Sequence, residues 1–76
     1  MRNETSEINQ KICLKIKIER IKRNWSQEQL AEYSNLSINT IGRIERSQIS
    51  PAIDTIVQIA EAFKMDFNKL TDITNL

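Results

Sequence analysis

Apolar residues recur every three or four positions along most of the 76-residue chain, which is the spacing of one face of an α-helix. The chain contains one glycine and one proline, so little interrupts the helices except short turns. The pattern predicts an all-α fold of five helices, over residues 8–23, 27–34, 38–46, 51–63 and 67–72. Residues 1–7 are polar and carry no capping signal, so we expect a flexible amino-terminal tail followed by one domain over 8–76.

Residues that favour helix ends mark the boundaries of these elements. Ser26 and Gln29, three positions apart, form a capping-box signature for the second helix. Asn35 follows that helix, and asparagine tolerates the left-handed conformation that a sharp turn requires. The other start signals are Ser37 for the third helix, Ser50 with Pro51 for the fourth, and Asp66 for the fifth.

The same periodicity indicates which side chains face inward. In the fourth helix the inward stripe is Ile53, Ile56, Val57, Ala60 and Phe63. The first helix carries two stripes, one of Ile8, Ile12 and Ile16 and one of Leu14, Ile18, Ile21 and Trp25. The second stripe either contacts a partner or packs against the tail and the following helices, and we expect Trp25 at the edge of the core.

The composition excludes most common kinds of catalytic and metal-binding site. The chain has no histidine and one cysteine, Cys13, which excludes the usual His and Cys zinc sites, His-based catalytic triads and an internal disulfide. We therefore expect no enzymatic activity, no metal and no cofactor. The apolar stretches are far shorter than the ~20 residues that span a bilayer, and residues 1–10 have no apolar signal core. We expect a cytoplasmic protein without a membrane partner.

The net charge of +1 conceals an asymmetry along the chain. Residues 1–25 hold seven Lys or Arg against three acids, a net charge of +4, so the other 51 residues carry −3. A basic first segment can bind an anionic partner such as nucleic acid, although such charge also occurs on ordinary solvated helices. Charge alone leaves both possibilities open.

Residues 27–46 have the spacing of a helix-turn-helix, with an eight-residue helix, a turn over 35–37 and a second helix. Two steeply crossing helices need a small residue where they touch, and Ala31 occupies that place. Ile41 and Ile44 lie on the face of the second helix that we expect to pack against the core. Its opposite face carries Asn39, Arg43 and Arg46. The combination favours a DNA-binding unit over a generic helical hairpin.

With these residues in place, the chain resembles the lambda repressor and Cro-type helix-turn-helix family, also called the XRE family. The resemblance covers Arg20 to Phe63, RIKRNWSQEQLAEYSNLSINTIGRIERSQISPAIDTIVQIAEAF. It includes Ser-Gln-x-x-Leu-Ala, then Ile-x-x-Ile-Glu-Arg, then a proline and a core helix with Ile-Ala. It implies a five-helix lambda repressor-like domain that binds double-stranded DNA.

In that family the third helix lies in the major groove, with its amino-terminal residues at the base edges. The resemblance implies base contacts by Ile38, Asn39, Thr40 and Arg43. Asn39 can pair with adenine and Arg43 with guanine through two hydrogen bonds each, and Thr40 can donate its hydroxyl or touch a thymine methyl. Ile38 departs from relatives that carry glutamine there, and it either contacts a thymine methyl or packs near Glu45.

The resemblance also implies contacts with the DNA backbone. Gln27 begins the second helix, where the family places a glutamine against phosphate and where free backbone N–H groups favour an anion. In relatives this glutamine also supports the side chain at the position of Ile38, which an isoleucine does not permit. The expected phosphate contacts are Gln27, Ser37, Arg46, Ser47 and Gln48, with Lys22 and Arg23 as further candidates.

Two more features match structural positions of the family. Arg20 and Glu45 correspond to an ion pair between the first and third helices, which we expect to hold the fold together. Gly42 lies inside a helix, at a cost of ~1 kcal/mol relative to alanine. Either it allows close approach to the DNA backbone, or it packs against the second helix, and we favour the second interpretation.

A unit of this size reads few base pairs, so the resemblance implies a two-fold homodimer on a pseudo-palindromic operator. We expect the dimer interface at Phe67, Leu70, Ile73 and Leu76, unless these residues fold back under the fourth helix. No ligand-binding domain follows in the sequence, so we expect no small-molecule ligand. The predicted function is a dimeric repressor or controller-type autoregulator. The alternative is an antitoxin-type protein-interaction module that retains a helix-turn-helix.

Overall fold

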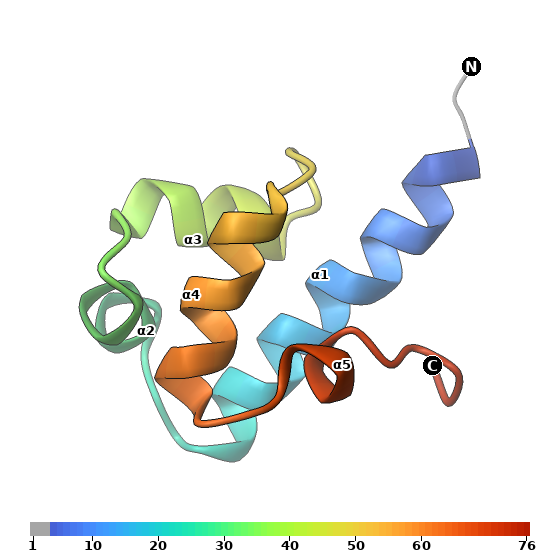
Figure 1. Ribbon diagram of the computed structural model, residues 1–76. Coiled ribbons are helices and arrows are strands. Elements are labelled where there is room, and N and C mark those ends of the chain that lie inside the picture. Colours follow the sequence, from blue (N-terminus) through green and yellow to red (C-terminus); the bar gives the residue numbers. More distant parts are fainter. Residues whose placement is uncertain (1–3) are drawn as a thin grey trace.

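The computed structural model describes residues 4–76, with side chains from residue 7 onward, and it is all-α over that range (Figure 1). The helices are α1 (Glu4–Lys22), α2 (Gln27–Ser34), α3 (Ile38–Glu45), α4 (Ile53–Phe63) and α5 (Phe67–Leu70). The longest, α1, runs beside the others, and α2, α3 and α4 pack into a compact group at its carboxyl-terminal half (Figure 1). The predicted fold class and the order of the five helices are confirmed.

The first helix is longer than the sequence pattern indicates. It begins at Glu4, so residues 4–7, which we expected in the tail, are helical, and residues 1–3 lie outside the described part. These four residues include no apolar side chain, so hydrophobic periodicity gives no sign of this turn. Acidic residues such as Glu7 are favourable near a helix amino terminus because of the helix dipole.

One core joins all five helices. Its buried members come from every helix, which explains how a chain of this size forms a single packed interior. They are Cys13 and Ile16 of α1, Leu30 and Ala31 of α2, Ile41 and Ile44 of α3, Ile56, Ile59, Ala60 and Phe63 of α4, and Leu70 of α5. Trp25 is partly buried at the edge of this core and stacks on Phe63, with the two ring centroids 5.6 Å apart.

Two of the predicted inward stripes need correction. Ile53 is exposed, whereas Ile59, which the predicted stripe of the fourth helix omits, is fully buried. In α1 only part of the second stripe packs against the following helices, because Leu14 and Ile21 remain 47% and 53% exposed while Trp25 contacts the core. Ile8 is also exposed. A helix with apolar residues on two sides does not reveal by periodicity alone which side faces the core.

The predicted starts of the last two helices are also only partly right. The start of α4 is Ile53, with Ala52 at the N-cap, so Ser50 and Pro51 lie in the preceding loop. This loop stays extended beside α1, where Asn9 donates from Nδ2 to the Ile49 carbonyl at 3.1 Å. Asp66 does occupy the N-cap of α5, but its side chain makes no capping hydrogen bond there. The expected fifth helix also ends earlier, at Leu70.

Sharp turns are made by residues other than glycine. Asn35 adopts φ 61° and ψ 39°, which confirms the predicted left-handed turn after α2. The other positive-φ residues are Asn24, Ser47 and Lys64. Asparagine tolerates this conformation better than most residues, whereas a lysine pays ~1 to 2 kcal/mol for it. The helix connections are therefore tight although the chain has only one glycine.

Candidate nucleic-acid interface

The turn between α2 and α3 fixes how α3 projects from the fold. Leu36 donates its backbone N–H to the Ala31 carbonyl at 2.9 Å, which closes α2 around Asn35. Ser37 then caps α3, because its hydroxyl oxygen accepts the backbone N–H of Thr40 at 3.0 Å. The side chains of Ile41 and Ile44 are fully buried. The inner side of α3 is therefore held by the core, and its outer side is free to face a partner.

A buried ion pair ties α3 to α1. Arg20 donates to both carboxylate oxygens of Glu45, at 2.7 Å from Nε and 3.0 Å from Nη2. Its Nη1 atom donates to the Trp25 carbonyl at 2.7 Å. The two side chains are only 14% and 2% exposed, so the pair is shielded from water. Arg20 and Glu45 thus form the expected structural ion pair, in bidentate geometry.

Gln27 joins the same cluster from α2. Its Nε2 atom donates to Glu45 Oε1 at 3.0 Å, so the three helices of this region meet at one carboxylate. The sequence gives no sign of this bond, because the two residues are 18 positions apart. One N–H of the Gln27 amide is thereby engaged inside the protein, and the second remains able to donate outward.

The outer side of α3 presents the predicted base-reading residues together. Asn39 and Arg43 are exposed, and Ile38 at the amino end of the helix is 48% exposed. Thr40 is partly buried, and its hydroxyl oxygen accepts a hydrogen bond from Ser37 at 2.9 Å. The single hydroxyl hydrogen of Ser37 is thus already used, which limits its predicted phosphate contact to backbone groups. Thr40 keeps its own hydroxyl hydrogen available.

The carboxyl end of α3 gathers the predicted phosphate contacts. Arg46 is exposed, and a Cβ atom added to Gly42 would lie 3.1 Å from Arg46 Nη1. The arginine therefore folds back over the glycine. The three heavy atoms nearest such a Cβ all belong to Arg46, so this side chain, rather than α2, lies closest to Gly42. Ser47 at φ 58° ends the helix, and Gln48 donates its backbone N–H to the Arg43 carbonyl at 2.9 Å. The Gln48 side chain is exposed.

Comparison with known proteins agrees with this geometry. The family model HTH_3, described as Helix-turn-helix, matches residues 16–70. The chain belongs to this helix-turn-helix family. The crystal structure of an HTH_3 family transcriptional regulator from Vibrio cholerae superposes with a TM-score of 0.84 over 88% of this chain, at 27% sequence identity. This chain spans 38% of the length of that protein. No match is found among curated proteins. The resemblance to lambda repressor-like proteins is confirmed.

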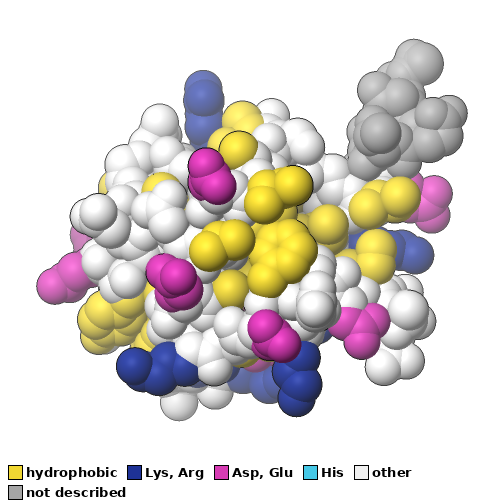
Figure 2. Space-filling model, viewed as in Figure 1, with side chains coloured by type: hydrophobic (Ala, Val, Ile, Leu, Met, Phe, Trp, Pro, Cys, Tyr) yellow, Lys and Arg dark blue, Asp and Glu magenta, His cyan; other side chains and the backbone are white. Residues whose placement is uncertain are grey.

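Other surfaces of this helix-turn-helix domain differ from the outer side of α3. Figure 2 shows the face on which α4 lies in front, where apolar side chains gather near the centre with acidic side chains around them. The lysine and arginine side chains visible on this face lie mainly along its edges (Figure 2). Such a face is a poor match for a phosphate backbone. No helix among the described residues is long and apolar enough to cross a membrane.

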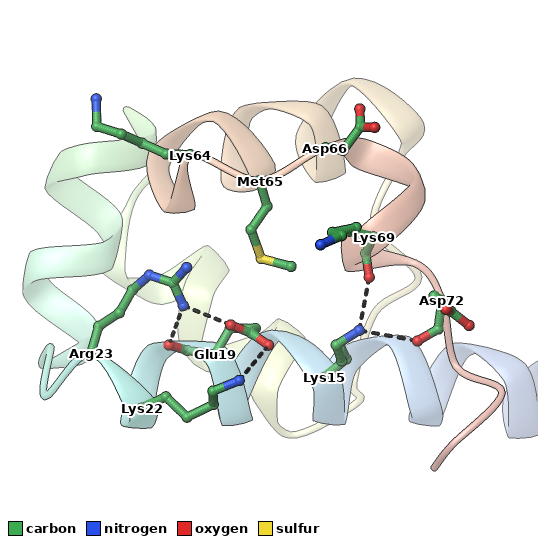
Figure 3. A pocket seen from close by; sticks show the side chains of 9 residues that line it. All are labelled: Lys15, Glu19, Lys22, Arg23, Lys64, Met65, Asp66, Lys69 and Asp72. Atoms are coloured by element: carbon green, nitrogen blue, oxygen red, sulfur yellow. Dashed lines mark hydrogen bonds and ion pairs between the residues drawn. The ribbon is translucent and has the colours of Figure 1, made fainter.

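An open cavity of about 480 Å³ lies between α1 and the turn from α4 to α5 (Figure 3). Arg23 donates from Nη1 to Glu19 Oε1 at 2.7 Å and from Nη2 to the Phe63 carbonyl at 3.0 Å. Lys22 also reaches Glu19, at 3.3 Å. Lys15 donates to the carbonyls of Lys69 and Asp72. Lys15 and Arg23 therefore link α1 to the carboxyl-terminal part of the chain, which makes Arg23 a structural residue. Lys22, whose side chain is 63% exposed, forms only a surface pair within α1.

The four residues predicted for a dimer interface differ in burial. Leu70 is fully buried in the core, and Phe67 is partly buried against it. These two residues fold back against α1 and α4, which was the alternative interpretation of the carboxyl-terminal stripe. Ile73 is partly buried, and Leu76 is 40% exposed. Leu70 is therefore excluded from any interface that leaves this fold intact.

Proposed function

We propose that this helix-turn-helix protein is a sequence-specific regulator of transcription that binds double-stranded DNA and reads the major groove with α3. The observation that carries the proposal is the outer side of α3, where Asn39, Arg43 and Arg46 are exposed together. Among the described side chains, neither arginine of this face forms an ion pair. The family membership and the transcriptional regulator from Vibrio cholerae support the same function. Such a protein would act in the cytoplasm, in association with the nucleoid.

In this proposal, base edges are read from the amino-terminal part of α3. Asn39 is suited to adenine and Arg43 to guanine, because each side chain can make two hydrogen bonds to that base in the major groove. Thr40 can donate its free hydroxyl hydrogen, and Ile38 offers an apolar contact. Each good bidentate pair contributes ~1 to 3 kcal/mol of discrimination between bases.

Phosphate contacts flank this reading segment. The amino end of α2 supplies the second amide N–H of Gln27 together with free backbone N–H groups. At the other end of α3, Arg46 supplies a charge, and Ser47 and Gln48 supply polar side chains. The backbone N–H groups next to the cap at Ser37 complete the set. These contacts would set the position of the protein on the duplex without reading its sequence.

The experiment is selection of bound duplexes from a random pool, followed by titration of variants against the selected sequence. Asn39→Ala and Arg43→Ala are expected to relax base preference at one position each, whereas Gln27→Ala is expected to weaken binding to all sequences alike. Asn39 and Arg43 are exposed, so their side chains can be removed without opening the core, whereas Gln27→Ala also removes the hydrogen bond to Glu45. A wild-type protein that shows no preference over random duplex at moderate salt would contradict the proposal.

The oligomeric part of the proposal is a two-fold homodimer that acts as a repressor or controller-type autoregulator on a pseudo-palindromic operator. With Leu70 excluded, the contact would involve Leu76 and the remaining surface of Phe67 and Ile73. Sedimentation equilibrium of a Leu76→Asp variant tests this, with Leu14→Asp on the outer side of α1 as the control. Dissociation is expected for the first variant, and loss of the dimer only in the second would place the contact on α1.

A second candidate is an antitoxin-type protein-interaction module. One observation favours it, namely the exposure of Leu14 and Ile21 on one side of α1. In that case a toxin encoded beside this gene would bind the wild-type protein and the Asn39→Ala variant equally. It would fail to bind Leu14→Asp. Equal toxin binding by Leu14→Asp would exclude this surface.

A further inference from the structure

Ile38 is an exposed apolar residue at the amino end of α3. It is the first residue of the helix, directly after the cap at Ser37, and 48% of its surface is exposed. It lies beside Asn39, which the proposed function assigns to a base edge. An isoleucine gains nothing from exposure to water in this place. Its side chain is therefore suited to an apolar feature of whatever α3 contacts.

Several hydrogen-bonding groups near this position are used within the protein. Glu45 follows Ile38 by two helical turns on the same side of α3, and it accepts from both Arg20 and Gln27. On the cap side, the hydroxyl hydrogen of Ser37 is donated to Thr40. One N–H of the Gln27 amide is thus engaged by Glu45. Recognition at this point then depends on the isoleucine itself.

The major groove has one apolar feature that an isoleucine can recognise, the C5-methyl group of a pyrimidine. We infer that Ile38 gives the protein a preference for a C5-methylated pyrimidine, thymine or 5-methylcytosine, at one position of each half-site. The inference rests on the proposed function, because it requires α3 in the major groove. Burial of one methyl group against Ile38 corresponds to about a fourfold gain in affinity per half-site.

Removal of single methyl groups from the DNA tests the inference. In the selected duplex, each thymine is replaced in turn by deoxyuridine, which removes only the methyl group and leaves the pairing unchanged. For the wild-type protein, one replacement per half-site is expected to lower the affinity about fourfold. For Ile38→Ala the same replacement is expected to have no effect, and Ile38→Val is expected to keep most of the dependence.

Matched controls separate this contact from general effects. Ile21→Ala removes an equally exposed isoleucine from the outer side of α1, and it is expected to retain the full methyl dependence. Thermal unfolding followed by circular dichroism shows whether each variant is folded. Where the selected position is cytosine, methylation of that cytosine is expected to raise the affinity of the wild type about fourfold and that of Ile38→Ala not at all.

The outcomes are distinguishable from failure of the proposed function. A protein that selects no sequence would overturn the proposed function and this inference together. A protein that selects a sequence, but whose dependence on every pyrimidine methyl group is the same with Ile38→Ala, would overturn this inference alone. Absence of any methyl dependence in the wild type would also overturn it.

Discussion

Two pairs of arginines in this small protein have opposite surroundings. Arg20 and Arg23, at the end of α1, each donate three hydrogen bonds to acceptors within the chain. Arg43 and Arg46, on the outer side of α3, are exposed, and neither forms an ion pair with a described side chain. The same residue type therefore stabilises the fold in one region and is available to a partner in the other.

The difference shows why a count of charges is a weak guide to a binding surface. Residues 1–25 hold most of the positive charge in the sequence, yet three of these cations, Lys15, Lys22 and Arg23, are engaged by Glu19 and by backbone carbonyls at the cavity of Figure 3. Arg43 and Arg46 are only two of the eleven lysines and arginines in the sequence, yet both are exposed and neither forms an ion pair with a described side chain. What matters for an interface is the charge that the fold leaves without an internal acceptor.

The largest expected effect on stability comes from removing Glu45, the carboxylate acceptor of Arg20. Glu45→Ala leaves the arginine charge buried without its partner, so the free energy of unfolding is expected to fall by ~3 to 5 kcal/mol. Urea unfolding followed by circular dichroism measures it, with Glu32→Ala on the exposed side of α2 as the control. A loss below ~1 kcal/mol, as for a surface ion pair, would contradict the structural role.

A slightly smaller loss of stability is expected when a core residue of α5 is truncated. Leu70→Ala removes a fully buried side chain from α5, so the free energy of unfolding is expected to fall by ~2 to 5 kcal/mol. The same change at Leu76, which is 40% exposed, is expected to alter stability by less than ~0.5 kcal/mol. Equal small losses in the two variants would mean that α5 does not pack as described.

The ion pair between Arg23 and its acceptor Glu19 is expected to make stability depend on pH. Burial raises the pKa of Glu19, but the hydrogen bonds and charges of Arg23 and Lys22 lower it by a larger amount. The pKa of Glu19 in the folded protein therefore lies below its ordinary value of 4.5. Because the folded pKa is depressed, this stabilisation is present above pH 4.5 and is lost as the pH falls toward the folded pKa. Thermal unfolding of Glu19→Gln between pH 3 and 7 is expected to show a flatter acid limb than wild type. An exposed-site control, Glu32→Gln, is expected to keep the wild-type slope.

The smallest expected effect on stability belongs to α3. Arg43→Ala removes an exposed side chain without an ion pair, so the free energy of unfolding is expected to change by less than ~0.5 kcal/mol. Its expected consequence is confined to binding of the selected duplex. Urea unfolding and duplex titration of the same preparation separate the two effects. A large stability loss would show that Arg43 has a structural role like that of Arg20.

Much of the fold follows from local signals in the sequence. Ser26, Asn35 and Ser37 act at short range, so capping rules place α2 and α3 correctly. The start of α1 at Glu4 escapes prediction because a polar turn has no hydrophobic period. In α4, the periodicity predicts that Ile53 faces inward but it is exposed, whereas Ile59, which the predicted stripe omits, is buried. Apolar residues occur on more than one side of this helix, and only tertiary packing decides which of them are buried.

The candidate site is predictable to a similar depth. The outward position of Asn39 and Arg43 follows from the helical period, and the pairing of Arg20 with Glu45 was implied by the family resemblance. The bond from Gln27 to Glu45 and the placement of Arg46 over Gly42 depend on side-chain conformation in three dimensions. Likewise, whether Arg23 binds phosphate or Glu19 depends on the turn from α4 to α5, which is 40 residues away in the sequence.

The contrast between the two surfaces is tested most directly by the salt dependence of duplex binding in two variants that each lose one positive charge. Arg46→Ala removes a charge from α3, and Lys22→Ala removes one beside Glu19. The logarithm of the binding constant falls linearly with the logarithm of the salt concentration. The magnitude of this slope is expected to decrease by about one for Arg46→Ala and to stay at the wild-type value for Lys22→Ala. Equal slopes for the two variants would contradict the assignment of α3 as the DNA-binding surface.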